Sequence, residues 1–191
     1  DLLIKEFPEI LISVDTFSSK IASETVQRGA SIINDISGGN MDEKMFSTIS
    51  NLNVPYIVMH MLGTPQNMQK NPVYKNVTQE VISFFAEKIF QLHQLKVNDI
   101  IIDVGFGFGK TITHNFELLQ NLSLFKSLDA PILAGVSRKS MLYKTLDTSA
   151  KEALNATTSA NTIALLNGAN ILRVHDVKEA VEAVKIVEQV L

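Results

Sequence analysis

Short runs of hydrophobic, β-branched residues recur along the chain, and each is followed by a longer segment with the apolar spacing of a helix. The runs lack the polar and apolar alternation of a sheet with one face in water, so the predicted strands are buried on both faces. Alternation of such strands with helices indicates parallel βα units. The six predicted strands are 10–15, 31–35, 56–60, 99–104, 131–135 and 170–174.

Two of the longer segments end in a recognisable helix stop. Residues 18–28 are followed by Gly29, and residues 150–167 are followed by Gly168. Glycine is favoured directly after a last helical turn because it adopts left-handed backbone angles at low cost. Both segments are therefore predicted to be helices, and residues 76–95 are a third because their apolar positions follow helical spacing.

The C-terminal part of the chain adds a helix start and an apolar stripe. Ser149 and Glu152 have the S-x-x-E spacing of a capping box, which predicts that a helix begins at residue 150. The final segment repeats apolar residues at helical spacing, the pattern of a helix that packs on a core or on a partner. The residues of this stripe are Val177, Ala180, Val181, Val184, Val187 and Leu191.

The number of repeating units limits the architecture. A (β/α)8 barrel needs about 250 residues, whereas the 191 residues of this chain accommodate six units. Residues 1–8 are interpreted as the tail of a helix and a loop that leads into the first strand. We therefore expect an α/β fold, with residues 1–191 forming a single domain that is a (β/α)8 TIM barrel with its first two units missing. A complete six-stranded Rossmann-like sheet is the competing architecture.

Composition removes several classes of protein. The sequence has no cysteine, which excludes disulfides, a cysteine nucleophile and thiolate metal sites. Its 17 Lys and Arg against 20 Asp and Glu give a net charge of −3, which argues against a nucleic acid partner. Its apolar runs fall well short of the roughly 20 residues that a membrane span needs. These features predict a soluble, cytoplasmic protein.

A chemically capable residue ends each predicted strand, at the edge where parallel α/β folds place their sites. A strand-end Asp or Asn is often only a turn former or a helix cap. Because the pattern recurs in every unit and the carboxyl ends of parallel strands converge, a functional site at this edge is the favoured interpretation. The residues are Asp15, Asn34 with Asp35, His60, Asp103, the segment 135–140, and Arg173 with His175.

The segment 105–111 (GFGFGKT) follows a strand and invites comparison with a P-loop. A P-loop requires G-x-x-x-x-G-K-[ST], and its first glycine would fall at the position of Val104. We therefore expect no phosphate-cradling loop of that type. The glycines would instead let the backbone approach a flat ligand, with Phe108 as an apolar surface, although a flexible strand-to-helix turn explains the segment equally well.

Cationic side chains follow the last two predicted strands. Arg138 and Lys139 lie in S-R-K-S, and Arg173 and His175 lie in R-V-H. Arginine presents a planar fork that suits phosphate oxygens, and a helix start beside it adds backbone N–H groups, so an anionic ligand or leaving group is the natural partner. A solvated basic loop with a capping histidine is the alternative. The histidines do not have the spacing of a zinc site.

Taken in order, these motifs resemble those of the dihydropteroate synthases of folate biosynthesis, and the resemblance covers essentially the whole chain. It implies a (β/α)8 barrel that condenses 6-hydroxymethyl-7,8-dihydropterin pyrophosphate with p-aminobenzoate, giving 7,8-dihydropteroate and pyrophosphate. The matching segments are SVDT at 13–16, IINDI at 32–36, MHM at 59–61 with GTP at 63–65, Asp103 with GFGFGK at 105–110, GVSRKS at 135–140 and RVHDV at 173–177.

The resemblance also implies roles for individual side chains. Asp103 and Asn34 would bind the edge of the pterin, with Asp15 near the reacting ring. Lys139 would contact both substrates, and catalysis would rest on Asp15, Asp103 and Lys139. The other substrate contacts would come from Ile36, Ile57, Met59 and Phe108 along the pterin slot, from Gly135, from Ser140 at the aminobenzoate carboxylate, and from Arg173 and His175 at the pyrophosphate.

Two departures from the family pattern stand out. Val104 occupies a position where proline is common, which alters the rigidity of the turn but removes no functional atom. The family's first two strand-end loops are absent, and with them an Asn associated with Mg²⁺, an Arg for pyrophosphate and part of the aminobenzoate site. The resemblance thus implies an Mg²⁺ cofactor without a metal ligand in this chain, and a homodimer at full length. It also implies an inactive, poorly soluble fragment with an uncapped sheet edge at residues 10–15.

Two other functions compete with this interpretation. A methyltransferase that acts on methyltetrahydrofolate and a corrinoid protein would share the pterin-binding Asp and Asn residues, but the S-R-K-S and R-V-H motifs favour the synthase. The chain could instead be a non-catalytic pterin-binding fragment. Pyrophosphate release on mixing both substrates would separate the three functions.

Overall fold

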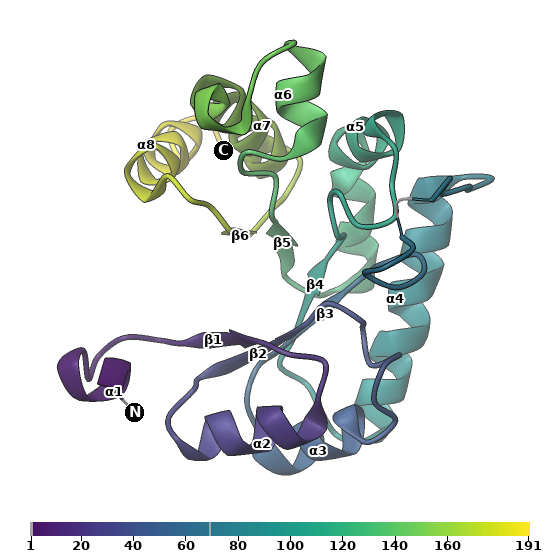
Figure 1. Ribbon diagram of the computed structural model, residues 1–191, viewed down its shortest axis with the longest axis vertical. Helices are drawn as coiled ribbons and strands as arrows, with labels where there is room; N and C mark the ends of the chain where they lie inside the picture. Colours follow the sequence, from purple (N-terminus) through teal and green to yellow (C-terminus); the bar gives the residue numbers. More distant parts are fainter. Residues whose placement is uncertain (1, 69) are drawn as a thin grey trace.

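A single parallel sheet organises the computed structural model, which describes residues 2–68 and 70–191 (Figure 1). Its strand order follows the sequence, so each strand pairs with the next one along the chain. A doubly wound Rossmann-like sheet reverses its order at a switch point, and the described strands show no reversal. The strands are β1 (Ser13–Asp15), β2 (Ile32–Asp35), β3 (Tyr56–Met59), β4 (Ile100–Asp103), β5 (Ile132–Ala134) and β6 (Ile171–Leu172).

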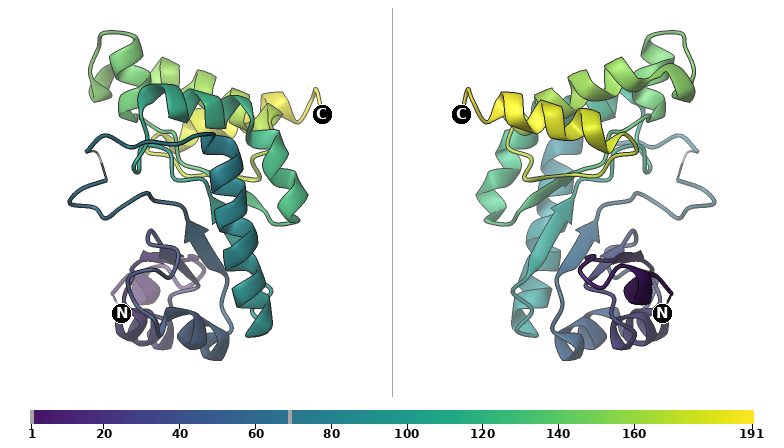
Figure 2. Two further views of the ribbon diagram at one scale, coloured as in Figure 1. Left: turned by 90° about the vertical axis from the view of Figure 1, so that its right-hand side faces the viewer. Right: turned by 90° about the vertical axis from the view of Figure 1, so that its left-hand side faces the viewer.

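Each connection between strands contains helix, and these helices lie on the convex side of the curved sheet (Figures 1 and 2). The result is the wall of an open barrel with six βα units. The predicted barrel architecture is confirmed, and the Rossmann-like alternative is wrong. The helices are α1 (Leu2–Glu6), α2 (Ser19–Gln27), α3 (Met45–Leu52), α4 (Val77–Gln94), α5 (Ile112–Gln120), α6 (Ser140–Thr145), α7 (Leu154–Leu166) and α8 (Val177–Val187), with 3-10 turns η1 (Leu122–Leu128) and η2 (Ala150–Glu152).

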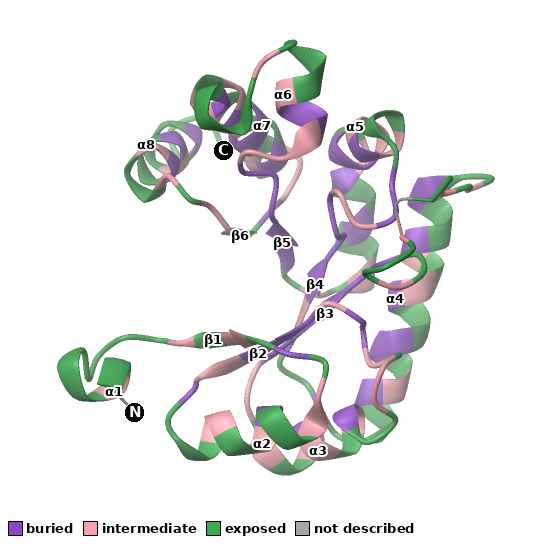
Figure 3. Ribbon diagram, in the orientation of Figure 1, coloured by how far each residue is buried: buried purple, intermediate pink, exposed green. Residues whose placement is uncertain are grey.

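The hydrophobic core lies between the sheet and these helices (Figure 3). Ile33, Val58 and Ile102 project into it from β2, β3 and β4 and are fully buried. Phe85 of α4 packs edge to face against Phe125, with ring centroids 6.2 Å apart. Because burial of each such side chain stabilises the fold by about 1.5–3 kcal/mol, the outer layer is a firm support for the opposite face of the sheet.

Strand register places candidate site residues on that opposite, inner face. Asp15 is paired with Asn34, and Met59 is paired with Asp103. Side chains alternate between the two faces along a strand, and residues paired across neighbouring strands point to the same face. Since Ile102 faces the core, Asp103 and its neighbours in register face the inside of the barrel wall.

The strands at the two edges of the sheet are shorter than predicted. Residues 10–15 were expected to form a strand but only Ser13–Asp15 do, and residues 170–174 reduce to Ile171–Leu172. The run of hydrophobic residues extends beyond the part of each segment that has a strand partner. Backbone hydrogen bonding between the last two strands still continues one residue past the end of β6, since Arg173 N donates to the Ala134 carbonyl oxygen at 3.0 Å.

The predicted capping box at Ser149 is wrong. Ser149 makes no side-chain cap, and a 3-10 turn precedes α7, which begins only at Leu154. The Glu152 carboxylate instead accepts a hydrogen bond from Thr148 Oγ1 at 2.5 Å. The glutamate is therefore bound to the preceding turn and does not form the reciprocal bond of a capping box.

A capping box that was not predicted begins α5. Thr111 Oγ1 accepts a hydrogen bond from His114 N at 3.1 Å, and His114 Nδ1 accepts one from Thr111 N at 3.3 Å. Histidine takes the place that Glu or Gln usually has, which is why the S-x-x-E pattern did not find it. No helix in the described residues has the length and apolar character needed to cross a membrane.

Candidate functional site

Asp103, the last residue of β4, is the most deeply buried charged group of the inner face. It is 0% exposed, and its two oxygens accept hydrogen bonds from Gly105 N at 2.8 Å and from Arg173 Nη2 at 2.7 Å. A buried carboxylate requires such partners because desolvation penalises its charge. Arg173 comes from the end of β6, and Gly135 leaves room for its guanidinium, since a Cβ there would lie 3.0 Å from Arg173 Nη2.

Asn34 and Asp15 form a second polar pair, at the ends of β2 and β1. Asn34 Nδ2 donates to Asp15 Oδ1 at 2.6 Å. Asn34 is 1% exposed, whereas Asp15 is exposed to solvent. Within residues 2–68 and 70–191, Asn34 Oδ1 is buried without a hydrogen-bond partner, and so is Arg173 Nη1. One acceptor and one donor on this face therefore lack the partners that buried polar atoms normally have.

Lys139 follows β5 and reaches over the loop after β4. Its Nζ donates to the Phe106 carbonyl oxygen at 2.6 Å and lies 4.5 Å from the centre of the Phe108 ring. Burial lowers the pKa of Lys139 to about 8; nearby Asp103 opposes this shift and Arg173 adds to it. The amine is thus held beside the Asp103 and Arg173 pair with one protein acceptor and an aromatic surface.

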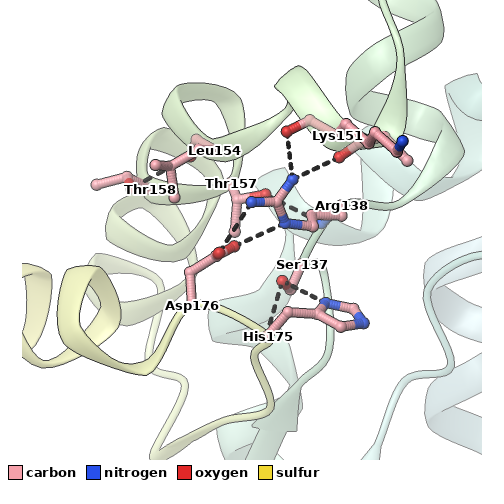
Figure 4. A network of polar contacts seen from close by, with 9 residues as sticks. Ser137, Arg138, Lys151, Leu154, Thr157, Thr158, His175 and Asp176 are labelled. Atoms are coloured by element: carbon pink, nitrogen blue, oxygen red, sulfur yellow. Dashed lines mark hydrogen bonds and ion pairs between the residues drawn. The ribbon is translucent and has the colours of Figure 1, made fainter.

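Arg138 ties the segments around Lys139 and His175 together (Figure 4). Its guanidinium donates to both carboxylate oxygens of Asp176 at 2.9 Å, and to the carbonyl oxygens of Ala150 at 2.7 Å and Lys151 at 2.5 Å. This network joins the loop after β5 to η2 and to the start of α8. It fixes the backbone on both sides of the cationic residues, and a paired fork of this kind has a defined geometry.

His175 is held by the hydroxyl group of Ser137. Ser137 Oγ lies 2.8 Å from His175 Nδ1 and accepts a hydrogen bond from His175 N at 3.2 Å (Figure 4). Ser137 is buried, whereas His175 is exposed. The buried hydroxyl therefore orients an exposed imidazole at the same end of the barrel wall as Arg173.

The predicted apolar residues lie on or beside the inner face. Ile57 and Met59 of β3 are buried, and Ile36 and Phe108 are half-buried in the loops after β2 and β4. Ser140 begins α6 directly after Lys139 and is half-buried. In the described ranges, no hydrogen bond or ion pair joins the Ser140 side chain to the other candidates. The structure thus brings the predicted polar residues into three contacts and leaves Ser140 apart from them. The contacts join Asp103 with Arg173, Asn34 with Asp15, and His175 with Ser137.

Asp35 has a structural role, as the turn-former interpretation of such residues predicted. Its carboxylate is 0% exposed. It accepts hydrogen bonds from the Ser37 backbone and hydroxyl at 2.8 and 2.7 Å, from Gly39 N at 2.8 Å and from the Tyr56 hydroxyl at 2.7 Å. These contacts use both oxygens to fold the loop after β2, and they leave Asn34 as the polar residue of β2 on the inner face.

Lys110 is a buried cation for which the sequence analysis gave no role. It is 4% exposed, and its Nζ lies 2.9 Å from His60 Nδ1. Burial lowers the pKa of Lys110 to about 7, with Asp103 opposing the shift. Burial, with a contribution from Lys110, lowers the pKa of His60 to about 2, so this imidazole is neutral. The signal in the sequence was a lysine directly after a glycine-rich strand end, with a histidine ending the preceding strand.

The charges of the site suit an anionic ligand with a polar ring. Arg173 is paired with the buried carboxylate of Asp103 and Lys139 lies nearby, so these cations outnumber the carboxylate. In the part of the chain that the structure describes, no cluster of three or more His, Cys, Asp or Glu side chains could hold a metal ion. These residues therefore do not fit an Mg²⁺ site.

Comparison with known proteins identifies relatives of the chain. Residues 1–175 match the family described as pterin binding enzyme. The dihydropteroate synthase of Escherichia coli K12 is 40% identical over 185 residues, 96% of this chain and 65% of the relative. That of Haemophilus influenzae is 38% identical over 177 residues, 92% of this chain and 64% of the relative. The chain thus spans just under two thirds of the length of these relatives.

Solved structures show the same likeness. The Yersinia pestis dihydropteroate synthase in complex with a sulfonamide drug has a TM-score of 0.94 and 36% identity, and the match covers 99% of this chain and 69% of that one. The Xanthomonas albilineans dihydropteroate synthase in complex with 7,8-dihydropteroate has a TM-score of 0.90 and 31% identity, with 99% and 71% covered. Both therefore share the fold of this chain over nearly all of its residues.

Proposed function

Because this chain belongs to the family of pterin binding enzymes, we propose that it carries most of the substrate site of a dihydropteroate synthase. The whole enzyme would condense 6-hydroxymethyl-7,8-dihydropterin pyrophosphate with p-aminobenzoate. The observation that carries this proposal is the fully buried Asp103, paired with Arg173 and adjoined by Lys139 on the inner face. Relatives solved with 7,8-dihydropteroate and with 4-aminobenzoic acid support it.

Asp103 and Asn34 are proposed to bind the edge of the pterin. Each Asp103 oxygen accepts one hydrogen bond from the protein, and a carboxylate oxygen can accept two. The remaining capacity suits the N–H groups of an aminopyrimidinone. Asn34 Oδ1, buried without a partner in the described residues, would accept a further N–H. A ligand that satisfies it removes a penalty of about 1–3 kcal/mol.

The ring itself would lie in an apolar slot. Ile57 and Met59 are buried on β3, and Ile36 and Phe108 flank the ends of β2 and β4. A flat heterocycle against such side chains combines burial of its faces with polar recognition of its edge. Gly135 would keep the neighbouring strand end open for Arg173 and the ligand.

The cations are proposed to act on the anionic parts of the substrates. Arg173 and His175 would bind the pyrophosphate, Lys139 would contact both substrates, and Ser140 would meet the aminobenzoate carboxylate. Arg173 Nη1 is buried without a partner in the described residues, so this N–H group could donate to a phosphate oxygen. A planar guanidinium can bind phosphate through two parallel hydrogen bonds.

This arrangement suits a reaction in which charge separates. The C–O bond to pyrophosphate breaks, and its electron pair leaves with the pyrophosphate. The resulting cation, delocalised over the dihydropterin, is captured by the aminobenzoate nitrogen, which then loses a proton. Asp15 and Asp103 would stabilise the cation, and Lys139, Arg173 and His175 the departing anion.

The cofactor and the assembly are also proposals. Mg²⁺ is the cofactor that we propose for the whole enzyme. The described residues offer no ligand cluster for it, and the family resemblance places its ligand in a strand-end loop that this chain lacks. We further propose a homodimer that packs through α7 and α8, where Ile163, Val181 and Ile186 are exposed. Light scattering tests this assembly, and a monomer at tens of micromolar protein would contradict it.

An assay of both products tests the function. We expect a protein of the relatives' length with these residues to release pyrophosphate only when both substrates are present, with an equal amount of 7,8-dihydropteroate. Methyl transfer from methyltetrahydrofolate to a corrinoid protein would show the methyltransferase instead. Pterin binding without either reaction would show a binding protein.

A further inference from the structure

We propose that Lys110 is a positioning residue: it fastens the loop after β4, residues 104–111, to the end of β3 and so sets the inner-face positions of Phe108 and Lys139. This inference rests on the proposed function, because it concerns how the same pterin site is held. Neither Phe108 nor Lys139 forms part of the ion pair between Asp103 and Arg173.

The Lys110 ammonium group lies in a cage of acceptors. Its Nζ donates to the carbonyl oxygens of Gly105 and Phe108, each at 3.0 Å, and to that of His60 at 3.3 Å. Lys110 Nζ also lies 2.9 Å from His60 Nδ1. In the described residues, Lys110 forms no ion pair with a carboxylate. Two loops from neighbouring strands thus converge on one buried amine.

Holding the loop through the buried Lys110 ammonium group costs the fold free energy. Burial lowers the pKa of Lys110 to about 7, which means that the fold penalises its charge. An apolar side chain in a rearranged loop would avoid this penalty, because buried charges seldom stabilise a fold more than apolar packing does. Lys110 therefore contributes loop geometry rather than stability, and this loop is part of the candidate site.

The backbone carbonyl groups of the loop after β4 accept hydrogen bonds from two different lysines. The carbonyl groups of Gly105 and Phe108 point to Lys110, whereas that of Phe106 accepts from Lys139. The next turn of the loop is fixed as well, since the Tyr74 hydroxyl donates to the Gly109 carbonyl oxygen at 2.8 Å. Removing the Lys110 amine would let the peptide groups around Phe106 rotate, and Lys139 and the Phe108 ring would lose their shared position.

Lys88 provides a matched control on the other side of the sheet. It is also buried, at 9% exposed, and its Nζ donates to Asn40 Oδ1 at 2.6 Å and lies 5.5 Å from the centres of the Phe46 and Phe84 rings. Lys88 lies on α4, which covers the convex face. Replacing it tests the effect of removing a buried lysine without touching the loop after β4.

The test compares ligand affinity in three variants of the chain. We expect Lys110→Met to bind 6-hydroxymethylpterin at least tenfold more weakly by calorimetry, and Lys88→Met to stay within twofold of the unsubstituted chain. Inorganic pyrophosphate should bind Lys110→Met within threefold of the unsubstituted chain, because its proposed ligands Arg173 and His175 are held by Asp103 and Ser137 and not by Lys110. A lysine that only stabilised the fold would leave the affinity of the folded chain unchanged.

Lys110→Gln separates loop contacts from charge and remains informative if Lys110→Met does not fold. Its amide can donate two hydrogen bonds to the loop carbonyl groups but carries no charge. We therefore expect the pterin affinity of Lys110→Gln to be clearly above that of Lys110→Met. If Lys110→Met is unfolded, we expect the pterin affinity of Lys110→Gln to lie within fivefold of that of the unsubstituted chain. A tenfold loss in Lys110→Gln would overturn the positioning role in favour of charge. Pterin affinity that stays unchanged in both variants would overturn it as well. Failure of the unsubstituted chain to bind pterin would overturn the proposed function itself, and the inference with it.

Discussion

The two polar corners of the inner face differ in how completely the protein holds them. In the buried corner, at the ends of β3 to β6, Asp103 is 0% exposed and both of its oxygens have partners. In the open corner, at the ends of β1 and β2, Asp15 is exposed and a single hydrogen bond joins it to Asn34. The same residue type at equivalent strand ends is therefore rigidly placed in one corner and loosely placed in the other.

The difference follows from the position of each strand in the sheet. β4 is paired on both sides, with β3 and β5, whereas among the described residues β1 is an edge strand paired only with β2. Asp103 is therefore flanked by a strand on each side, and Arg173 from the end of β6 and Lys139 after β5 lie close to it. We infer that the buried corner is preorganised for its ligand, and that the open corner adjusts to it.

Two glycine substitutions should show a large contrast between the loop of the buried corner and a turn beside the edge of the sheet, at the opposite end of β2 from Asn34. Gly105 has a φ of +69°, and a Cβ there would collide with the His60 carbonyl oxygen. Gly29, before β2, has a φ of +102°, but its Cβ would meet only the Ile4 side chain at 3.2 Å. We expect Gly105→Ala to lower the free energy of unfolding by more than ~3 kcal/mol and Gly29→Ala by about 1–2 kcal/mol. Urea denaturation measures both, and equal losses would contradict the tighter packing around the loop of the buried corner.

Acid should weaken the buried corner through His60. Burial lowers the pKa of His60 from 6.5 to about 2, so below pH 6.5 the unfolded chain binds a proton that the folded chain does not. Stability is therefore lost as pH falls from 6.5 toward 2, at up to about 1.4 kcal/mol per pH unit. Between pH 7 and 5 we expect the unsubstituted chain to lose about 2 kcal/mol more than His60→Gln. Parallel pH profiles of the two proteins would show that His60 is protonated in the fold.

Ligand affinity tests the buried corner directly. Asp103→Asn keeps the shape of the side chain but removes the charge that pairs with Arg173 and one oxygen that can accept from the pterin. We expect binding of 6-hydroxymethylpterin to weaken at least tenfold in calorimetry, which corresponds to about 1.4 kcal/mol. Thermal unfolding of the variant serves as the control for folding. Unchanged affinity in a folded variant would remove Asp103 from the site.

The sequence predicted local features better than contacts between distant segments. Hydrophobic runs predicted six parallel strands, and their polar ends predicted Asp103 and Asn34 on one face. The roles of Lys110 and Arg173 depend on partners 50 and 70 residues away, and no spacing along the chain shows which strand ends meet. The S-x-x-E pattern at Ser149 failed for a different, local reason, because the hydroxyl group of Thr148 in the preceding turn binds the glutamate. Resemblance of the motifs to a known family supplied roles that periodicity could not.

The smallest effect is expected from Asp15→Asn, which repeats the substitution of Asp103 in the open corner. The new amide retains an oxygen that can accept from Asn34 Nδ2, now at 2.6 Å from Asp15 Oδ1, and the lost charge is exposed to water. A hydrogen bond of this exposure contributes about 0.5–1 kcal/mol, and the variant keeps most of it. We therefore expect pterin affinity to change less than threefold. Turnover in a protein of the relatives' length should fall by a larger factor than this affinity, because a charge beside the reacting ring stabilises the cation only when the cation forms. A loss of pterin affinity as large as that of Asp103→Asn would show that the open corner is as firmly organised as the buried one, and the edge position of β1 would then not explain the difference between them.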